Sequence, residues 1–182
     1  MKPISSLSSF FQSTLSSPAC NRVLYRTIRR FKVSSILEVG IGDASRATKM
    51  IRMAQKYSMS NVRYTGIDSF ESSPSHQITL KDCHQKLSVL ESKLQLVPGD
   101  LASSMMRIAN SHVRTDMLVI SSSYHTDELE QIWYYVPRML HAASVVFIQD
   151  ASDNEGYFEQ LGRLEIERMV KKVPNVASAR AA

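Results

Sequence analysis

The sequence has only two cysteines among 182 residues, and it lacks any long uninterrupted run of apolar residues. Cys20 and Cys83 are too few for a disulfide scaffold and do not form a CxxC pair, so we expect a reducing compartment. No stretch approaches the roughly 18 apolar residues of a membrane-spanning helix, so we expect no integral membrane protein and no membrane partner. The proportions of apolar (43%) and charged (21%) residues are those of a globular protein, and the length predicts one domain.

Acidic residues are absent from residues 1–37, which therefore have a net charge of +6. The whole chain is +5, so the remainder is close to neutral, at −1. Because the positive charge belongs to an N-terminal segment rather than to a face of the domain, we do not expect a nucleic-acid partner. Residues 1–20 are rich in serine and are interpreted as a flexible leader. The expected location is cytoplasmic, and the alternative is organellar (mitochondrial) targeting by residues 1–37.

Five short segments predict strands, the first of them a buried strand, and segments with helical spacing separate them. The predicted strands are Ser35–Val39, Val62–Ile67, Leu94–Val97, Asp116–Ile120 and Ser144–Ile148. The predicted helices are Asn21–Lys32, Ala44–Tyr57, 76–91, Leu101–Ala109, 127–140 (bent or shortened at Pro137) and Glu155–Lys172. This alternation predicts an α/β fold with a doubly wound, mostly parallel sheet over residues 21–182, and a ligand at the carboxyl ends of the strands.

Glycine is scarce, yet two of the six glycines, Gly40 and Gly42, stand at the first strand-to-helix turn. Ser45 occupies the place of the third glycine in a GxGxxG dinucleotide motif, so that fingerprint is incomplete. Glu38 adds a negative charge that does not favour a pyrophosphate but suits an ammonium or sulfonium group. The alternative is that Glu38 forms a salt bridge with a nearby arginine such as Arg46.

Acidic residues also end the next two predicted strands. Asp68 can accept hydrogen bonds from both hydroxyls of a ribose, or it can cap the turn that begins at Ser69. Asp100 can accept from the exocyclic amine of adenine, or it can cap the helix that begins at Leu101. Three acidic residues at the ends of successive strands favour a nucleoside site over capping alone.

The segments ILEVGIGDAS, YTGIDSFE and LVPGDL resemble the nucleoside-binding motifs of class I S-adenosylmethionine (SAM)-dependent methyltransferases. The segment SSSYHTDELEQIWYYVPRMLHAASVVFIQDAS is similar to the small-molecule O-methyltransferase-like branch, and the resemblance covers Val33–Asp150. It implies a Rossmann-like methyltransferase fold, SAM as cofactor and a small-molecule methyl acceptor. The implied cofactor-binding residues are Glu38, Gly40 and Gly42 at the methionine end, Asp68 with Ser69 at the ribose, Asp100 with Leu101 at the adenine, and Ser121 after the fourth strand.

Two departures from the family pattern bear on the mechanism and on the partners. Ser121 begins a run of three serines where the branch often has an acidic residue that binds a metal, so we expect no metal. After Asp150 the sequence predicts only a helix, so the terminal antiparallel strands of the family are not predicted. A second subunit could complete the substrate-side wall that these strands normally form, so we expect a homo-oligomer as a partner.

Catalytic candidates follow the fourth and fifth strands. Methyl transfer is an in-line displacement that depends mainly on positioning, and a general base is needed only where the acceptor must lose a proton. Tyr124, His125 and Asp150 are the candidates, with stacking, loop hydrogen bonding and helix capping as their respective alternatives. The competing functions are a non-catalytic nucleoside-binding or scaffold protein and an NAD(P)-dependent oxidoreductase, which fits Glu38 and Ser45 poorly.

Overall fold

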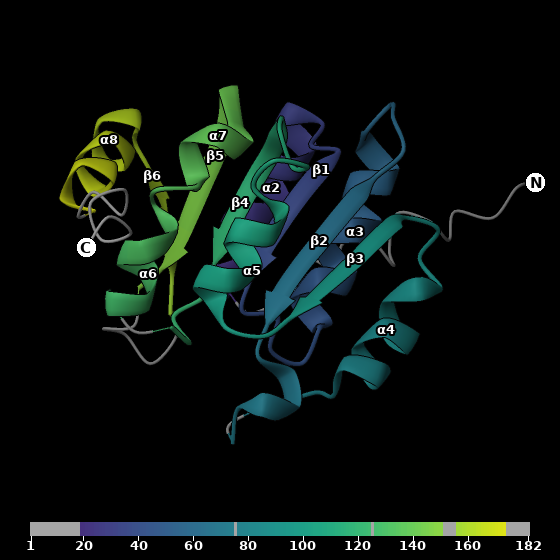
Figure 1. Ribbon diagram of the computed structural model, residues 1–182. Helices are drawn as coiled ribbons and strands as arrows, with labels where there is room; N and C mark the ends of the chain where they lie inside the picture. The colour runs from purple at the N-terminus through teal and green to yellow at the C-terminus, as the bar shows by residue number, and fades with distance from the viewer. Residues whose placement is uncertain (1–18, 75, 125, 151–155, 174–182) are drawn as a thin grey trace, which may run out of the picture.

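The computed structural model describes residues 19–74, 76–124, 126–150 and 156–173. These residues form a six-stranded sheet with the order β3-β2-β1-β4-β5-β6 (Figure 1). The strands are β1 (Ser35–Val39), β2 (Arg63–Asp68), β3 (Lys93–Pro98), β4 (Thr115–Ile120), β5 (Leu140–Gln149) and β6 (Phe158–Leu161). The first five strands are parallel, whereas β6 pairs with β5 in the antiparallel direction. The predicted fold class is confirmed.

Helices cover both faces of the sheet, as a doubly wound topology requires. The helical elements are η1 (Ala19–Asn21), α2 (Arg22–Phe31), α3 (Ser45–Tyr57), η2 (Phe70–Ser72), α4 (Leu80–Ser88), α5 (Leu101–Ile108), α6 (Thr126–Ile132), α7 (Val136–Met139) and α8 (Arg163–Lys172). In Figure 1, α5 and α6 lie in front of the sheet, and α2 and α3 lie behind it. No helix among these described segments is long and apolar enough to span a membrane.

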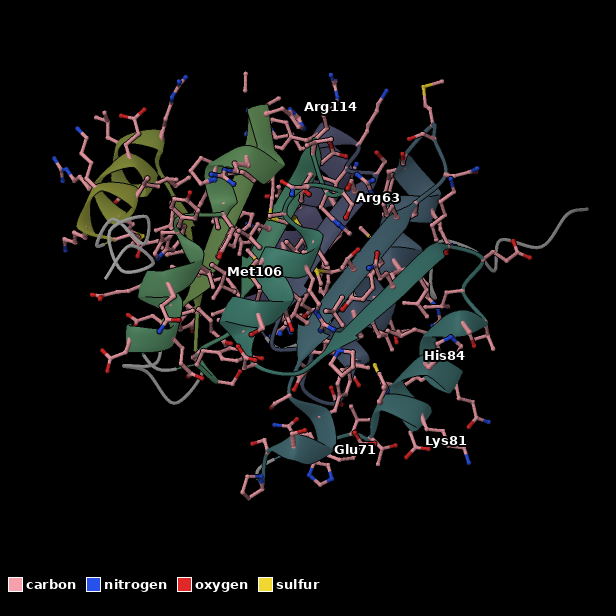
Figure 2. All side chains as sticks on the ribbon, in the orientation of Figure 1. Arg63, Glu71, Lys81, His84, Met106 and Arg114 are labelled. Atoms are coloured by element: carbon pink, nitrogen blue, oxygen red, sulfur yellow. The ribbon has the colours of Figure 1, made fainter. Side chains whose placement is uncertain are left out.

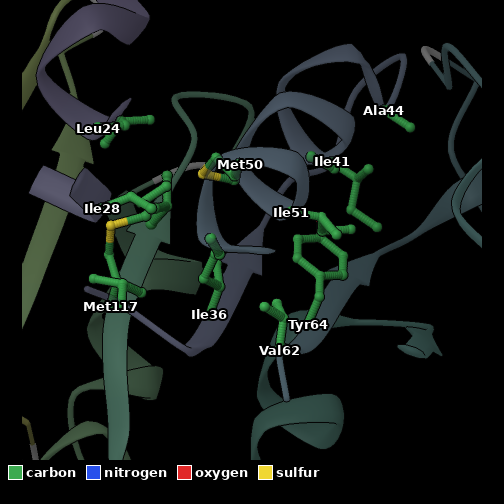
Figure 3. Close-up of a cluster of buried hydrophobic side chains, with 14 of the residues drawn as sticks. Leu24, Ile28, Ile36, Ile41, Ala44, Met50, Ile51, Val62, Tyr64 and Met117 are labelled. Atoms are coloured by element: carbon green, nitrogen blue, oxygen red, sulfur yellow. The ribbon is translucent and has the colours of Figure 1, made fainter. Parts of the chain in front are cut away.

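The buried hydrophobic side chains form two clusters, one on each face of the sheet, because successive side chains of a strand point to opposite faces. Ile36 packs with Ile28 of α2 and Met50 of α3 on one face, as Figure 3 shows. Leu37, the next residue of β1, packs with Met105 of α5 and other residues on the opposite face. All of β1 is buried, so this strand is the central support of the loop that follows it.

The amino ends and the carboxyl ends of the parallel strands lie at opposite edges of the sheet. The amino ends of β2 and β4 lie at the edge marked by Arg63 and Arg114 in Figure 2. The loops that follow β1, β2 and β4 lie at the opposite edge, where Glu71 of η2 is labelled. A ligand of a doubly wound sheet is expected at this carboxyl edge.

The structure corrects the prediction for the chain after Asp150. The predicted helix Glu155–Lys172 begins only at Arg163, and Phe158–Leu161 form β6. Phe158 and Leu161 are spaced three residues apart, as on a helix face, so the sequence pattern alone favoured a helix. Pairing with β5 satisfies backbone groups that the edge of the sheet would otherwise leave unpaired, and this outweighs local propensity. One antiparallel strand is therefore present beyond the five that were predicted.

Candidate functional site

The loop between β1 and α3, residues 40–44, lies at the carboxyl edge of the sheet and approaches the serines that follow β4. Gly40 has a φ of +80°, a conformation that residues with a side chain rarely adopt. A Cβ atom at this position would lie 2.6 Å from Oγ of Ser123 and 2.7 Å from Cβ of Ser121. Glycine at position 40 is therefore required both by the turn and by the close approach of the two loops.

Asp68 connects the end of β2 to this glycine loop. Its Oδ2 accepts hydrogen bonds from the backbone N–H groups of Ile41 at 2.7 Å and Gly42 at 3.4 Å. Its Oδ1 accepts from the N–H of Phe70 at 3.1 Å, so the capping role considered for Asp68 is realised. Each carboxylate oxygen can accept more than one hydrogen bond, so these contacts leave capacity for a ligand hydroxyl.

Glu38 is completely buried and is paired with Arg46, as its alternative interpretation proposed. Arg46 Nε lies 2.5 Å from Oε1 of Glu38, and the Tyr64 hydroxyl donates a hydrogen bond to Oε2. Burial raises the pKa of the Glu38 carboxyl, and the Arg46 charge and the Tyr64 hydrogen bond oppose that rise. Both oxygens of Glu38 are therefore occupied within the protein.

Asp100 caps α5. Its carboxylate accepts from the N–H of Ser103 at 2.9 Å, which holds the pKa of this exposed carboxyl below its ordinary value. Leu101 is buried in the core beneath α5. Neither residue lines the two cavities that adjoin Gly42.

The first of these cavities has a volume of about 110 Å³ and brings together several of the predicted site residues. Its walls include Gly42, Asp68, Ser69, Ser121 and Tyr124. The Tyr124 hydroxyl is buried and has no hydrogen-bond partner in the part of the chain that the structure describes. Burial raises the pKa of Tyr124, and the charge of Asp68 contributes in the same direction. A buried hydroxyl without a partner is costly unless a ligand or water completes it.

Asp150, another catalytic candidate, lines neither of the two cavities. Asp150 follows β5, is exposed, and donates its backbone N–H to the Tyr157 carbonyl at 2.9 Å. His125 lies outside the described residues. Within the described ranges, no group of three or more His, Cys, Asp or Glu residues is placed to hold a metal ion.

The second cavity, of about 420 Å³, contains residues that the sequence analysis did not assign to the site. It shares Gly42, Gln77, Ser121 and Ser123 with the first cavity, so the two cavities adjoin at the glycine loop. The volume of the second cavity is in the range of small-molecule sites, which commonly have about 300–1,000 Å³, whereas the first cavity alone is smaller.

Gln149, in the wall of the second cavity, holds the serine run in place. Its Oε1 accepts from the hydroxyl of Ser121 at 3.1 Å and from the N–H of Ser122 at 3.3 Å. Its amide nitrogen donates to the carbonyl of Gly156 at 2.9 Å. The sequence signal that could have identified Gln149 is its position. It is a polar residue directly after the apolar residues of β5, and it therefore lies at the same edge of the sheet as Asp68.

Comparison with known proteins gives structural matches only. No protein-family model matches the sequence. No curated protein matches it either. A TehB-like SAM-dependent methyltransferase from Corynebacterium glutamicum has a TM-score of 0.54 at 15% identity, with 92% of this chain and 79% of that chain covered.

Two further solved structures match the same fold. A TDP-rhamnose 3′-O-methyltransferase of calicheamicin biosynthesis has a TM-score of 0.61 at 15% identity, covering 93% of this chain and 75% of that one. A methyltransferase from Podospora anserina, solved with S-adenosylhomocysteine (SAH) bound, has a TM-score of 0.53 at 16% identity over 75% of this chain and 54% of that one. At these identities the likeness shows the fold alone. The chain has the Rossmann-like fold of SAM-dependent methyltransferases.

Proposed function

We propose that the chain binds SAM at the carboxyl edge of the sheet and transfers its methyl group to a small-molecule acceptor. The observation that carries this proposal is that Asp68 lines one cavity beside Gly42 together with Tyr124, whose buried hydroxyl has no hydrogen-bond partner among the described residues. An acceptor and a donor that face the same space suit the hydroxyls of a ribose. The methyltransferase fold supports the same ligand.

Individual residues have separable roles in this proposal. Asp68 accepts hydrogen bonds from the ribose, and Tyr124 donates one to the nucleoside. Gly42 lets the ligand approach the backbone without a side chain in the way. Ser69 and Ser121 line the same cavity and offer hydroxyl groups to the ligand.

Catalysis in this proposal rests on positioning. When bound, SAM supplies an electrophilic methyl carbon, and the acceptor atom must lie in line with the bond that breaks. The serine run, held by Gln149, orients the polar groups around that point. An acceptor that loses a proton needs a nearby base, for which Asp150 and His125 remain the proposed candidates.

The test is the production of SAH from SAM with a methyl label in the presence of a library of small acceptors. We expect the wild-type protein to release SAH and label one acceptor class, and Asp68→Ala to lose this activity. Asp82→Ala is the matched control, because Asp82 is an exposed carboxylate on α4 that does not line either cavity. Equal turnover by both variants would contradict the assigned site.

A second candidate is a nucleoside-binding or scaffold protein that performs no methyl transfer. The burial of Glu38, with both of its oxygens bonded inside the protein, favours it, because that carboxylate is not presented to a ligand. Saturable SAH binding without any labelled product from the acceptor library would support this candidate over the enzyme.

A further inference from the structure

Exposed apolar side chains gather at the edge of the sheet opposite the candidate site. Among the described residues, Phe31, Met59, Val89 and Val113 are four of the eight large hydrophobic side chains that are exposed to solvent. They precede β1, β2, β3 and β4 respectively, so all four lie near the amino ends of these parallel strands. Met59, at 92% exposure, is almost completely surrounded by solvent. Single exposed apolar side chains are common, whereas a group of them at one place marks a contact surface.

Hydrogen bonds join the segments that carry these side chains. The N–H of Arg63 donates to the carbonyl of Ser34 at 2.7 Å, and the N–H of Lys93 donates to the carbonyl of Val62 at 2.9 Å. Asp116 accepts from the N–H of Ser34 at 2.8 Å. The strand order β3-β2-β1-β4 therefore sets the four segments side by side. Together they are called the amino-edge surface, which comprises residues 29–34, 56–63, 89–93 and 110–116.

The amino-edge surface has a large excess of positive charge. It contains seven basic side chains and two acidic ones. Of the acidic residues, Asp116 is hydrogen-bonded within the edge, and Glu91 is exposed. Figure 2 labels two of the basic residues, Arg63 and Arg114, at this edge. The basic residues are Arg29, Arg30, Lys32, Lys56, Arg63, Lys93 and Arg114.

The packing of α2 makes the charge of the N-terminal segment part of a face of the domain. Leu24 and Ile28 of α2 are fully buried and belong to the same hydrophobic cluster as Met50 of α3 (Figure 3). Arg29, in the last turn of α2, is thereby held beside α3, with 5.8 Å between its Cζ and the centre of the Tyr57 ring. The sequence pattern alone assigned this charge to a separate segment. Its place in the fold removes the reason for expecting no polyanionic partner.

We propose that the amino-edge surface docks the protein on a lipid bilayer that contains anionic headgroups. The basic side chains attract the headgroups, and Phe31, Met59 and Val113 enter the boundary between the headgroups and the acyl chains. The expectation of no membrane partner rested on the lack of a spanning apolar run, which has no bearing on a peripheral contact of this kind. The inference goes beyond the proposed function and does not depend on it, because the candidate site lies at the opposite edge.

The combination of side chains favours a lipid surface over a nucleic acid. A nucleic acid is bound by cations that contact its phosphates and by rings on which its bases stack. Met59 and Val113 carry neither a charge nor a ring, so their exposure at this edge serves a bilayer better. Tyr57 lies between the cations of two helices, with Lys56 Nζ 5.7 Å and Arg29 Cζ 5.8 Å from its ring centre. Tyrosine rings are enriched at the headgroup level of membranes.

The test is flotation of the protein with vesicles of phosphatidylcholine alone and with vesicles of phosphatidylcholine mixed with phosphatidylserine. The variants are Arg30→Gln and Met59→Ser, which change exposed side chains, and thermal melts confirm that both variants fold. Lys81→Gln on α4 and Met106→Ser on α5 are the matched controls. Both control residues are exposed and lie outside the amino-edge surface, as Figure 2 shows.

We expect the protein to float with the mixed vesicles and not with phosphatidylcholine alone, and the binding to weaken as salt is added. Arg30→Gln should lower the partition coefficient about five-fold, through the loss of one cation at the surface. Met59→Ser should lower it about ten-fold, through the loss of apolar burial. Both control variants should partition as the wild-type protein does.

The proposal is overturned if the protein does not float with the mixed vesicles. It is also overturned if either Arg30→Gln or Met59→Ser partitions as wild type, since the contact would then lie elsewhere in the chain or lack its apolar part. SAH titration of the same variants tests the proposed function separately, because neither residue lines the two cavities beside the glycine loop.

Titration of a short RNA duplex, followed by fluorescence anisotropy, examines the other polyanionic partner. RNA binding that is weakened by Arg30→Gln but not by Met59→Ser, in the absence of vesicle binding, would assign the amino-edge surface to a nucleic acid. That outcome would overturn the proposed lipid contact.

Discussion

Asp68 at the end of β2 fixes the backbone of Ile41 in the loop that follows β1, with 2.7 Å between its Oδ2 and the N–H nitrogen of Ile41. The same carboxylate also caps the turn into η2 through Phe70. The carboxylate that is proposed to bind the ribose therefore also shapes the glycine loop. Its structural and ligand-binding roles can be separated by substitution.

Asp68→Asn should separate the structural role of Asp68 from its ligand-binding role more clearly than Asp68→Ala. The amide keeps one oxygen acceptor for the loop but cannot accept through both sides of the group. We expect Asp68→Ala to lose about 1–3 kcal/mol of the free energy of unfolding, and Asp68→Asn to lose less, while both lose SAH affinity. Urea denaturation and calorimetric titration measure the two effects. Unchanged SAH affinity in Asp68→Asn would show that the carboxylate does not contact the ligand.

The buried Glu38–Arg46 pair predicts a non-additive pattern of stability. Arg46→Ala leaves an uncompensated buried carboxylate and should cost about 3–5 kcal/mol at pH 7. The double variant Glu38→Gln/Arg46→Ala removes the charge and should be more stable than Arg46→Ala alone. A double variant less stable than Arg46→Ala in urea denaturation would contradict a charge-based explanation.

The pH dependence of Arg46→Ala follows from the same pair. Burial raises the pKa of Glu38 in the folded protein, and without Arg46 an opposing effect is lost, so the folded pKa rises further. Folding then disfavours the ionised carboxyl, and stability falls as pH rises from the ordinary pKa of about 4.3 through the raised folded value. The stability difference from wild type should therefore be larger at pH 7 than at pH 5, as measured by denaturation at the two values.

The hydrogen bonds of Asp116, near the amino ends of the strands, predict that the free energy of unfolding falls at acidic pH. Its Oδ2 accepts from the N–H groups of Ser34 at 2.8 Å and Ser35 at 2.9 Å, and His141 lies 3.0 Å from Oδ1. Partial burial alone would raise the pKa of Asp116, but these hydrogen bonds outweigh it and lower the pKa. A lowered folded pKa gives stability that is complete above the ordinary value of about 3.9 and is lost as pH falls through the folded value.

Asp116→Asn should therefore cost about 1–3 kcal/mol at pH 7. The difference between this variant and wild type should shrink as the pH falls below ~4, because the Asp116 carboxyl is then protonated, first in the unfolded state and at lower pH in the folded state. Denaturation midpoints at pH 7 and pH 3 test this directly. A difference that stays constant between the two pH values would show that the carboxylate charge is not what stabilises this edge.

Tyr124→Phe removes the buried hydroxyl that has no partner among the described residues. Because no hydrogen bond among the described residues is lost, we expect the melting temperature without ligand to stay the same or rise. The stabilisation by saturating SAH should fall, since the hydroxyl is proposed to donate to the nucleoside. Thermal melts with and without SAH provide the measurement, and full SAH stabilisation in Tyr124→Phe would remove Tyr124 from the site.

The presence and the parallel direction of the first five strands could be predicted because five short strand-like segments alternate with helical ones. β1 has the predicted bounds, and the break in the helix at Pro137 is also present, at the first turn of α7. β6 could not be predicted, because its two buried residues are spaced as on a helix. Its conformation depends on the unpaired edge of β5, which local sequence does not reveal.

For the site, the sequence predicted the acidic residues at the strand ends but only some of their partners. The approach of Asp68 to the glycine loop follows from two adjacent parallel strands, and the Glu38–Arg46 pair was foreseen as an alternative. Asn21 and Gln149 could not be placed at the same cavity from the sequence, because they lie 128 residues apart and meet only through the packing of α2 against α3 and the sheet.

The central claim, that this chain binds SAM at the carboxyl edge, is tested most directly by calorimetric titration of the wild-type protein and Asp68→Ala with SAM and SAH. The account predicts micromolar binding of both ligands to wild type, about −8 kcal/mol, and its loss in Asp68→Ala. No heat of binding and no thermal stabilisation of the wild-type protein by either ligand would contradict it.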